Sequence, residues 1–321
     1  RDGTQLLLNT EQSRVVRMYT EEERGSAPRV FCVLSPPGSG KTTVAAAMAA
    51  ALNVAVDNMG AALAQLEYGG AKIYNMKSNQ KLDPHQPTPF DYFDSIDDYG
   101  RRLWQKKKDD LEAERRSGSR KYQNVAKKYD EKLTDERRDF EKTASPTIIL
   151  STVEMMLFKM FAARSNIAGI MSRVDRIIID EASLLTEAAL FCIIRRFPHA
   201  RLILIGDDRQ LPPFMYDERI LGHELAGRPS LSVAMKNRAA PIIRLTEVYR
   251  APPSLVEPYN RLAYGGTLRS RKPEGAYPLS DLGLIPSGCP QLLFIDVQGS
   301  QERDSRNMSL SNENEKMILI R

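Results

Sequence analysis

The stretch RVFCVLSPPGSGKTTVAAAMAA, residues 29–50, decides the fold class of this 321-residue chain. Its apolar run at 30–34 is typical of a buried parallel strand, its Pro- and Gly-rich centre predicts a turn, and its alanine-rich end predicts a helix. This order predicts a phosphate-binding loop, in which backbone N–H groups and a helix N-terminus surround phosphates. The strict pattern G-x-x-x-x-G-K-[ST] has glycine where this chain has Ser35.

The residue types in the loop still indicate a nucleotide site. Glycine is needed where the backbone must approach a phosphate or take a positive φ, whereas a small residue suffices at the strand exit. Lys41 is expected to bridge the β- and γ-phosphates, and the Thr42 hydroxyl to ligate Mg²⁺. We therefore predict ATP and Mg²⁺ as ligands, held by these two residues and by Pro37, Gly38, Ser39, Gly40 and Thr43.

Two polar motifs follow two further apolar runs. Asp180 and Glu181 come directly after RIII, so the aspartate is expected to hold Mg²⁺ and the glutamate to orient or deprotonate the attacking water. GDDRQLPP at 206–213 follows RLILI, and its Gln210 is expected to sense the γ-phosphate. The alternatives are an acidic helix start and a plain turn. Strands that alternate with helices predict an α/β fold, with ligands at the carboxyl ends of parallel strands.

A proline-rich loop at 82–94 and a helical hairpin at 95–143 are predicted as an insertion into this fold. Between 101 and 142 there are 15 Lys and Arg against 10 Asp and Glu, an excess equal to the net charge of +5 of the whole chain. The hairpin is expected to be either a basic surface along the path of a nucleic-acid strand or a solvated packing element.

Composition excludes several classes of protein. The three cysteines and three histidines are scattered, which argues against disulfides, zinc and a Ser-His-Asp site. No apolar run reaches the roughly 18 residues of a membrane span. We expect an intracellular protein, in the cytoplasm or nucleus, that is monomeric, does not enter a membrane, and has protein regulators as possible partners.

Four motifs stand in the order SPPGSGKT (35–42), DEAS (180–183), GDDRQLPP (206–213) and LTEVYRAP (245–252). This order is similar to superfamily 1 helicases, subgroup B, of the nonsense-mediated-decay helicase-like family. LNTEQ at 8–12 resembles the adenine-reading motif of that family. The resemblance implies a RecA-like P-loop NTPase fold, ATP between two RecA-like domains, and 5′-to-3′ movement on single-stranded RNA or DNA.

The resemblance also implies roles for single residues. It places Gln12 at the adenine base, with Tyr249 stacking on it. Arg250 would meet the γ-phosphate, and Gln210 would couple the phosphate state to domain motion. Thr152 occupies the place of a threonine that contacts nucleic acid. The implied catalytic set is Lys41, Asp180, Glu181, Gln210 and Arg250.

One departure concerns NVAVDN at 53–58, which resembles the family's first strand-contact motif and implies nucleic-acid contacts by Asn53 and Asn58. Only 11 residues separate Lys41 from Asn53. A helix and a strand together need roughly 15 to 17 residues. Either the chain lacks this strand, or residues are missing from the sequence; the second is favoured because VAVDN fits a helix interior poorly.

The predicted organisation has four parts. Residues 1–76 carry the glutamine motif and phosphate loop of the first RecA-like domain, 77–144 are the insertion, 145–247 complete the domain, and 248–321 begin a second, apparently truncated one. The predicted function is an ATP-dependent nucleic-acid helicase or translocase. The alternatives are a P-loop ATPase that remodels protein complexes and a catalytically incomplete nucleic-acid-binding scaffold.

Overall fold

The computed structural model describes only part of the chain. It describes residues 8–20, 28–51, 73–76, 148–161, 172–213, 227–237, 240–274, 295–303 and 310–320, with the single positions 105, 109, 113, 131 and 146. The chain divides into two compact units, Arg1–Arg250 and Ala251–Arg321, and each is described by itself. The predicted hairpin lies almost wholly outside the described residues.

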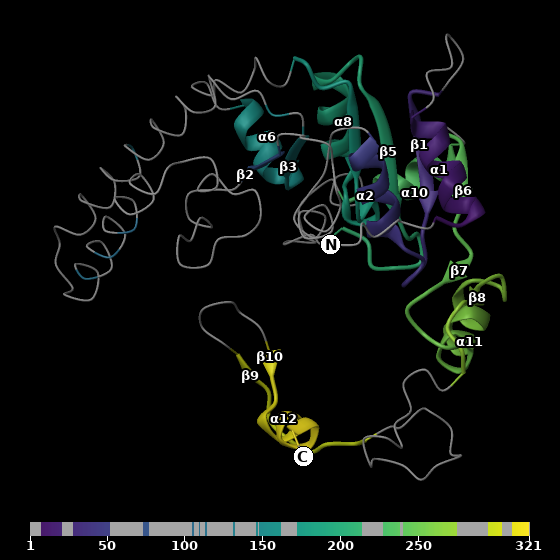
Figure 1. The fold of residues 1–321 in the computed structure, drawn as a ribbon. Helices are drawn as coiled ribbons and strands as arrows, with labels where there is room; N and C mark the ends of the chain where they lie inside the picture. Colours follow the sequence, from purple (N-terminus) through teal and green to yellow (C-terminus); the bar gives the residue numbers. More distant parts are fainter. Residues whose placement is uncertain are drawn as a thin grey trace, which may run out of the picture. The chain divides into compact units, whose positions relative to one another are not determined.

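The first unit alternates strands and helices (Figure 1). Its elements are α1 (Thr10–Thr20), β1 (Val30–Leu34), α2 (Lys41–Ala51), β2 (Ile73–Met76), β3 (Ile148–Ser151), α6 (Val153–Phe161), β4 (Arg176–Ile179), the 3₁₀ turn η2 (Ala182–Leu184), α8 (Glu187–Arg196), β5 (Arg201–Gly206), α10 (Ser230–Lys236), β6 (Ile242–Arg244) and β7 (Glu247–Val248). The apolar runs at 30–34, 176–179 and 201–206 are therefore strands, as predicted.

The strands form a parallel sheet in the order β4-β5-β1-β6. β2 and β3 form a second parallel pair. All strand residues of β3 and β4 are buried, as expected where helices cover both faces of a parallel sheet. The predicted α/β class with a parallel sheet is confirmed, and the sheet order places the ends of β1, β4 and β5 at one edge.

Successive residues of the central strand β1 pack into two different cores. Phe31 and Val33 join the cluster that contains residues of α1 and α2, while Cys32 and Leu34 join the cluster that contains residues of α8 and α10. Alternation with period two follows from the pleat of a strand. Each fully buried aliphatic or aromatic side chain contributes about 1.5–3 kcal/mol, so both faces are held against their helices.

Two arginines fix the carboxyl end of α1. Arg176, at the start of β4, donates from Nη1 to the carbonyl of Tyr19 at 2.6 Å, and its guanidinium lies 5.7 Å from the centre of the Tyr19 ring. Arg201, at the start of β5, donates to the carbonyl of Met18 at 3.2 Å. Positive charge at a helix C-terminus is favourable because the last carbonyls lack partners within the helix. These contacts fix the helix that carries Gln12.

The second unit contains α11 (Pro253–Ala263), β8 (Arg269–Ser270), β9 (Glu302–Arg303), β10 (Leu310–Ser311) and α12 (Glu313–Ile320). The buried Asn260 side chain donates to the carbonyl of Leu268 at 3.1 Å and accepts from its N–H at 3.0 Å, which ties α11 to the following turn. That 248–321 begins a second RecA-like domain stays a prediction. No helix among the described residues has both the length and the apolarity needed to cross a membrane.

Candidate active site

The loop between β1 and α2 takes a shape that only glycine permits at two positions. Gly38 has φ 74° and Gly40 has φ 88°, both in the left-handed region. A Cβ on Gly38 would lie 2.5 Å from the Cβ of Arg250, and a Cβ on Gly40 would lie 2.6 Å from Nε2 of Gln12. Backbone conformation favours glycine at both positions, and the Cβ of Arg250 leaves no room for a side chain at Gly38.

Three contacts from neighbouring segments hold this loop. The N–H of Ser35 donates to the carbonyl of Gly206 at 2.8 Å, at the end of β5. The N–H of Tyr249 donates to the carbonyl of Gly38 at 2.8 Å. The side-chain amide of Gln12 donates to the carbonyl of Ser39 at 3.1 Å. Two loop carbonyls are thus bound by groups outside the loop, which suits an anion site because carbonyl oxygens repel phosphate.

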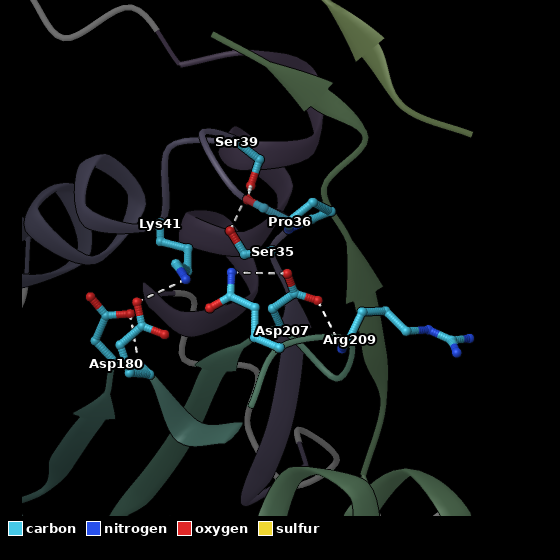
Figure 2. A network of polar contacts seen from close by, with 9 residues as sticks. Ser35, Pro36, Ser39, Lys41, Asp180, Asp207 and Arg209 are labelled. Carbon is cyan, nitrogen blue, oxygen red and sulfur yellow. Dashed lines mark hydrogen bonds and ion pairs between the residues drawn. The ribbon is translucent and has the colours of Figure 1, made fainter. Parts of the chain in front are cut away.

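The loop lysine lies against the acidic turn that follows β4. Nζ of Lys41 is 2.8 Å from Oε1 of Glu181, with the lysine side chain 13% exposed and the glutamate 47% exposed. Oδ1 of Asp180 accepts from the N–H of Glu181 at 2.8 Å. Figure 2 shows the Lys41 side chain extended toward the turn that carries Asp180. The fold therefore brings together the lysine and both carboxylates that the sequence singled out.

Burial raises the pKa of the Asp180 carboxyl above its ordinary value, and the nearby charge of Glu181 raises this pKa further. The N–H of Glu181 and the charge of Lys41 act in the opposite direction. The ionised carboxylate is therefore costly in the ligand-free protein. A bound cation would reduce that cost, since it adds an opposite charge beside the buried oxygen atoms.

The donor set fits Mg²⁺. Asp180 supplies carboxylate oxygens, and Thr42 supplies a hydroxyl from the first turn of α2. Magnesium prefers oxygen ligands and binds through one or two carboxylates with phosphates and water. Within the described ranges no group of three or more His, Cys, Asp or Glu side chains could hold a metal alone. The oxygen atoms of Asp180 and Thr42 are of the type that binds an ion whose other ligands are phosphate and water.

The backbone of the acidic turn is strained at Glu181. Its φ of 51° and ψ of 40° make it the one non-glycine residue with positive φ among the described residues. A left-handed conformation costs an L-residue about 1–2 kcal/mol, and such costs collect at functional sites. The left-handed conformation of Glu181 turns the backbone from β4 into η2. The Glu181 side chain then lies against Lys41.

The turn after β5 is organised by Asp207, which is 2% exposed. Its Oδ1 accepts from the N–H of Arg209 at 3.1 Å, and its Oδ2 accepts from Nε2 of Gln210 at 3.2 Å. The N–H of Gln210 also donates to the carbonyl of Asp207 at 3.2 Å. Gln210 is therefore held on this turn by both its main chain and its side chain.

Tyr249 forms a cluster with two other side chains, Asn9 and Glu247. Nδ2 of Asn9 donates to the Tyr249 hydroxyl at 2.7 Å and to Oε2 of Glu247 at 3.0 Å, and the Tyr249 hydroxyl donates to the same Oε2 at 2.7 Å. Asn9 also exchanges hydrogen bonds with Gln12, main chain to side chain in both directions, at 2.7 and 3.1 Å. Asn9 thereby connects Gln12 and Tyr249, the two residues that are predicted to contact adenine.

Glu11 makes a second tie between the same segments. Its Oε2 accepts from the N–H of Thr246 at 2.7 Å, and its Oε1 accepts from the Thr246 hydroxyl at 2.6 Å. The sequence did not single out Asn9, Glu11, Thr246 or Glu247. The signal was available, because all four lie inside the motifs LNTEQ and LTEVYR, within three residues of Gln12 or Tyr249, which were predicted to contact ATP.

The remaining predicted residues occupy several places. Thr43 lies in the first turn of α2 and Pro37 in the loop before it. Arg250 lies beside Gly38 and is exposed. Thr152 follows β3, where its hydroxyl accepts from the N–H of Met155 at 3.3 Å at the start of α6. Asn53 and Asn58 lie outside the described residues.

Comparisons with known proteins agree with this architecture. A family model described as an AAA domain matches residues 70–218, which include the acidic turn and Gln210 but not the phosphate loop. An uncharacterized ATP-dependent helicase of Caenorhabditis elegans is 30% identical over 159 residues, covering 48% of this chain and 10% of that protein. The 5′-3′ DNA helicase ZGRF1 of Mus musculus is 30% identical over 142 residues, covering 41% and 7%. The chain spans a tenth or less of these curated relatives.

The fold is that of a RecA-like P-loop NTPase. Its four-stranded parallel sheet carries a glycine loop after β1 and an acidic pair after β4. Both relatives are named as helicases, which supports the resemblance to superfamily 1 helicases in its broad form.

Proposed function

We propose that this chain binds Mg²⁺-ATP at the loop 35–42 and hydrolyses it as part of a nucleic-acid helicase or translocase. The observation that carries the proposal is the 2.8 Å contact between Lys41 and Glu181. This contact joins a glycine loop that can surround phosphate to a carboxylate that can accept a proton. Support also comes from the two helicase relatives.

In this proposal the phosphates lie against the N-terminus of α2. Gly38 and Gly40 let the main chain approach them, Ser39, Pro37 and Thr43 complete the loop and the first turn, and Lys41 adds a positive charge. Thr42 and Asp180 would hold Mg²⁺, which supplies neutralisation of phosphate charge when bound.

Glu181 is proposed as the acceptor of the proton of the attacking water. The water oxygen forms a bond to the γ-phosphorus while the bond to the bridging oxygen breaks, and the proton passes to the Glu181 carboxylate. For this step the Glu181 carboxylate must separate from Lys41. The phosphates then replace Glu181 as the ionic partner of Lys41. Exposure of 47% leaves the Glu181 side chain room to move. Gln210 and Arg250 are proposed to respond to the γ-phosphate.

The base of ATP is proposed to lie between Gln12 and Tyr249. Tyr249 is 37% exposed, so part of its ring is available for stacking. Its hydroxyl is held by Asn9 and Glu247, which fixes the direction of the ring. A ring that is fixed before binding loses less conformational entropy when the base arrives.

The partner is proposed to be single-stranded RNA or DNA, with movement from 5′ to 3′ and with Thr152, Asn53 and Asn58 as contacts. The order of the motifs supports placement in the nonsense-mediated-decay helicase-like subgroup, and one relative is named as a 5′-3′ DNA helicase. The free thiols of Cys32 and Cys192 suit a reducing, intracellular compartment. A monomeric state stays a prediction.

The test is phosphate release by the 321-residue chain with Mg²⁺-ATP, alone and with poly(U) RNA or oligo(dT) DNA. We expect stimulation by polynucleotide that declines steeply with salt, because phosphate contacts release counterions. The matched control variants are Lys236→Ala and Glu154→Gln, both exposed and outside the site. If neither polynucleotide raises the rate or binds, the helicase proposal is wrong; stimulation by a protein alone would favour a remodelling ATPase.

A further inference from the structure

We propose that Ser35, the residue that departs from the strict loop pattern, is a positioning residue that holds the phosphate loop in its binding shape through Ser39. The inference rests on the proposed nucleotide binding and assigns a role to a residue outside the predicted site set. It predicts that glycine at position 35, which would restore the strict pattern, weakens nucleotide binding.

Two buried hydroxyls cross the inside of the loop (Figure 2). Oγ of Ser35 lies 2.7 Å from Oγ of Ser39, and Oγ of Ser39 donates to the carbonyl of Pro36 at 2.7 Å. The two serines are 0% and 1% exposed. The N–H of Ser39 also donates to the Pro36 carbonyl, at 3.2 Å.

The direction of the Ser35–Ser39 hydrogen bond follows from its neighbours. A hydroxyl has one proton to donate, and the Ser39 proton is directed to the Pro36 carbonyl. The Ser35 hydroxyl must therefore donate to Ser39. The result is a one-way chain, from Ser35 to Ser39 to Pro36, in which both protons are bound and solvent is excluded.

The hydrogen bonds from Ser35 to Ser39 and from Ser39 to Pro36 close the loop across its base. The N–H of Ser35 is fixed to Gly206 on β5, and Ser39 is fixed through its carbonyl to Gln12 on α1. The hydroxyl bond connects these two fixed points directly. Opening the loop would leave buried hydroxyls without partners, which is unfavourable. A loop that is already closed loses little entropy when phosphate binds.

Glycine would bring no conformational advantage at position 35. In this loop, positive φ occurs at Gly38 and Gly40, so the backbone at Ser35 suits any L-residue. Glycine would remove the donor hydroxyl and add backbone freedom in the ligand-free loop. Alanine would remove the hydroxyl alone. The two substitutions therefore separate the hydrogen bond from chain stiffness.

The experiment measures binding of the fluorescent nucleotide mant-ATP to the full chain and to Ser35→Ala, Ser35→Gly and Ser39→Ala. We expect Ser35→Ala to bind about fivefold more weakly, and Ser35→Gly about tenfold, from the loss of one hydrogen bond and of stiffness. Competition with unlabelled ADP should show the same losses, whereas competition with adenosine should not, because only phosphates contact the loop. The double variant Ser35→Ala/Ser39→Ala should lose less binding free energy than the two single variants added together. Both substitutions break the same pair of hydrogen bonds, so their effects are not independent.

Thr186→Ala is the matched control, because it removes a hydroxyl whose hydrogen bond is to α8 and not to the loop, in the same unit. It should lower the melting temperature and leave mant-ATP binding unchanged. Melting curves by circular dichroism verify that each variant folds. If the unsubstituted chain does not bind mant-ATP, the proposed function fails. If it binds and the Ser35 variants bind equally well, or lose adenosine in the same proportion, the role of Ser35 is wrong.

Discussion

The loop after β1 and the turn after β4 lie at the same edge of one parallel sheet. They differ in backbone conformation and in how their polar groups are paired. The loop places glycine at its left-handed positions and ties its buried groups to neighbours. The turn places Glu181 in a left-handed position and carries the half-buried carboxyl of Asp180, whose pKa is raised by its partial burial. One is relaxed before any ligand binds, whereas the other carries strain and charge.

Under the proposed function, this difference suits a division of roles between nucleotide binding by the loop and catalysis by the turn. A phosphate site benefits from groups that are already in place, because ordering them on binding would reduce affinity. A catalytic carboxylate benefits from an environment in which its charge is not fully compensated, since it can then respond to a cation and a proton. Substitutions in the loop should therefore act on binding, and substitutions in the turn should act on the reaction and on stability.

The largest expected effects come from substitutions of Glu181 and Lys41, which should separate the catalytic step from nucleotide binding. Glu181→Gln should lower kcat for ATP hydrolysis by about 10²- to 10⁴-fold, the range for loss of a general base, while mant-ATP binding persists. Lys41→Ala should abolish mant-ATP binding, because the charge that faces the phosphates is gone. Steady-state phosphate release and fluorescence titration measure the two effects. A Glu181→Gln variant that loses binding as completely as Lys41→Ala would remove the distinction between loop and turn.

The next effect concerns the glycines. Gly38→Ala combines a left-handed backbone with a Cβ 2.5 Å from the Cβ of Arg250, whereas Gly265, with φ 61°, has nothing within 4 Å of such a Cβ. Gly265→Ala should cost about 1–2 kcal/mol from conformation alone. Gly38→Ala should cost more than that and abolish mant-ATP binding. Urea denaturation followed by circular dichroism compares the pair; equal losses would mean that Arg250 simply moves aside.

A smaller effect tests whether the loop depends on α1. Glu11→Gln keeps one oxygen acceptor for Thr246 but replaces the other with a donor amide, so one of the two short bonds is lost. We expect a loss of about 1.5–3 kcal/mol in the free energy of unfolding, typical of a hydrogen bond to a charged group, with weaker mant-ATP binding because Gln12 is displaced. Glu154→Gln, on an exposed position of α6, should change neither quantity.

The smallest expected effect concerns Asp180, and here the substitution should stabilise the protein and not destabilise it. Asp180→Asn should raise the melting temperature of the ligand-free chain, because it removes a half-buried charge and keeps an oxygen for the N–H of Glu181. Since folding raises the pKa of this carboxyl, the native state holds the proton to higher pH, and its stability falls as pH rises through the folded pKa.

The gain from Asp180→Asn should therefore be largest above that folded pKa. It should vanish below about pH 3.9, the usual pKa of Asp in unfolded chains, where the carboxyl is protonated in both states. Melting curves across pH measure it. A variant that is less stable at neutral pH would show that Asp180 is a stabilising charge, and that the turn is as relaxed as the loop.

The sequence by itself determined the strands, the loop and the identity of the chemical groups. Short apolar runs such as VFCVL and RIII, each followed by turn or acidic residues, are typical of buried strands, and glycines before a lysine and threonine favour a phosphate loop. It did not indicate a role for Ser35 or Asn9, because a serine or an asparagine in a loop has many ordinary uses.

Only the tertiary structure decided which of these groups meet. Lys41 and Glu181 are 140 positions apart, and Asn9 and Tyr249 are separated by 240, so their contacts depend on the order β4-β5-β1-β6 and on the position of α1. Local sequence fixes periodicity and turn chemistry, which depend on neighbouring residues. The direction of a buried hydroxyl or the strain at Glu181 depends on every segment packed around it, and that information becomes available only when the chain is folded.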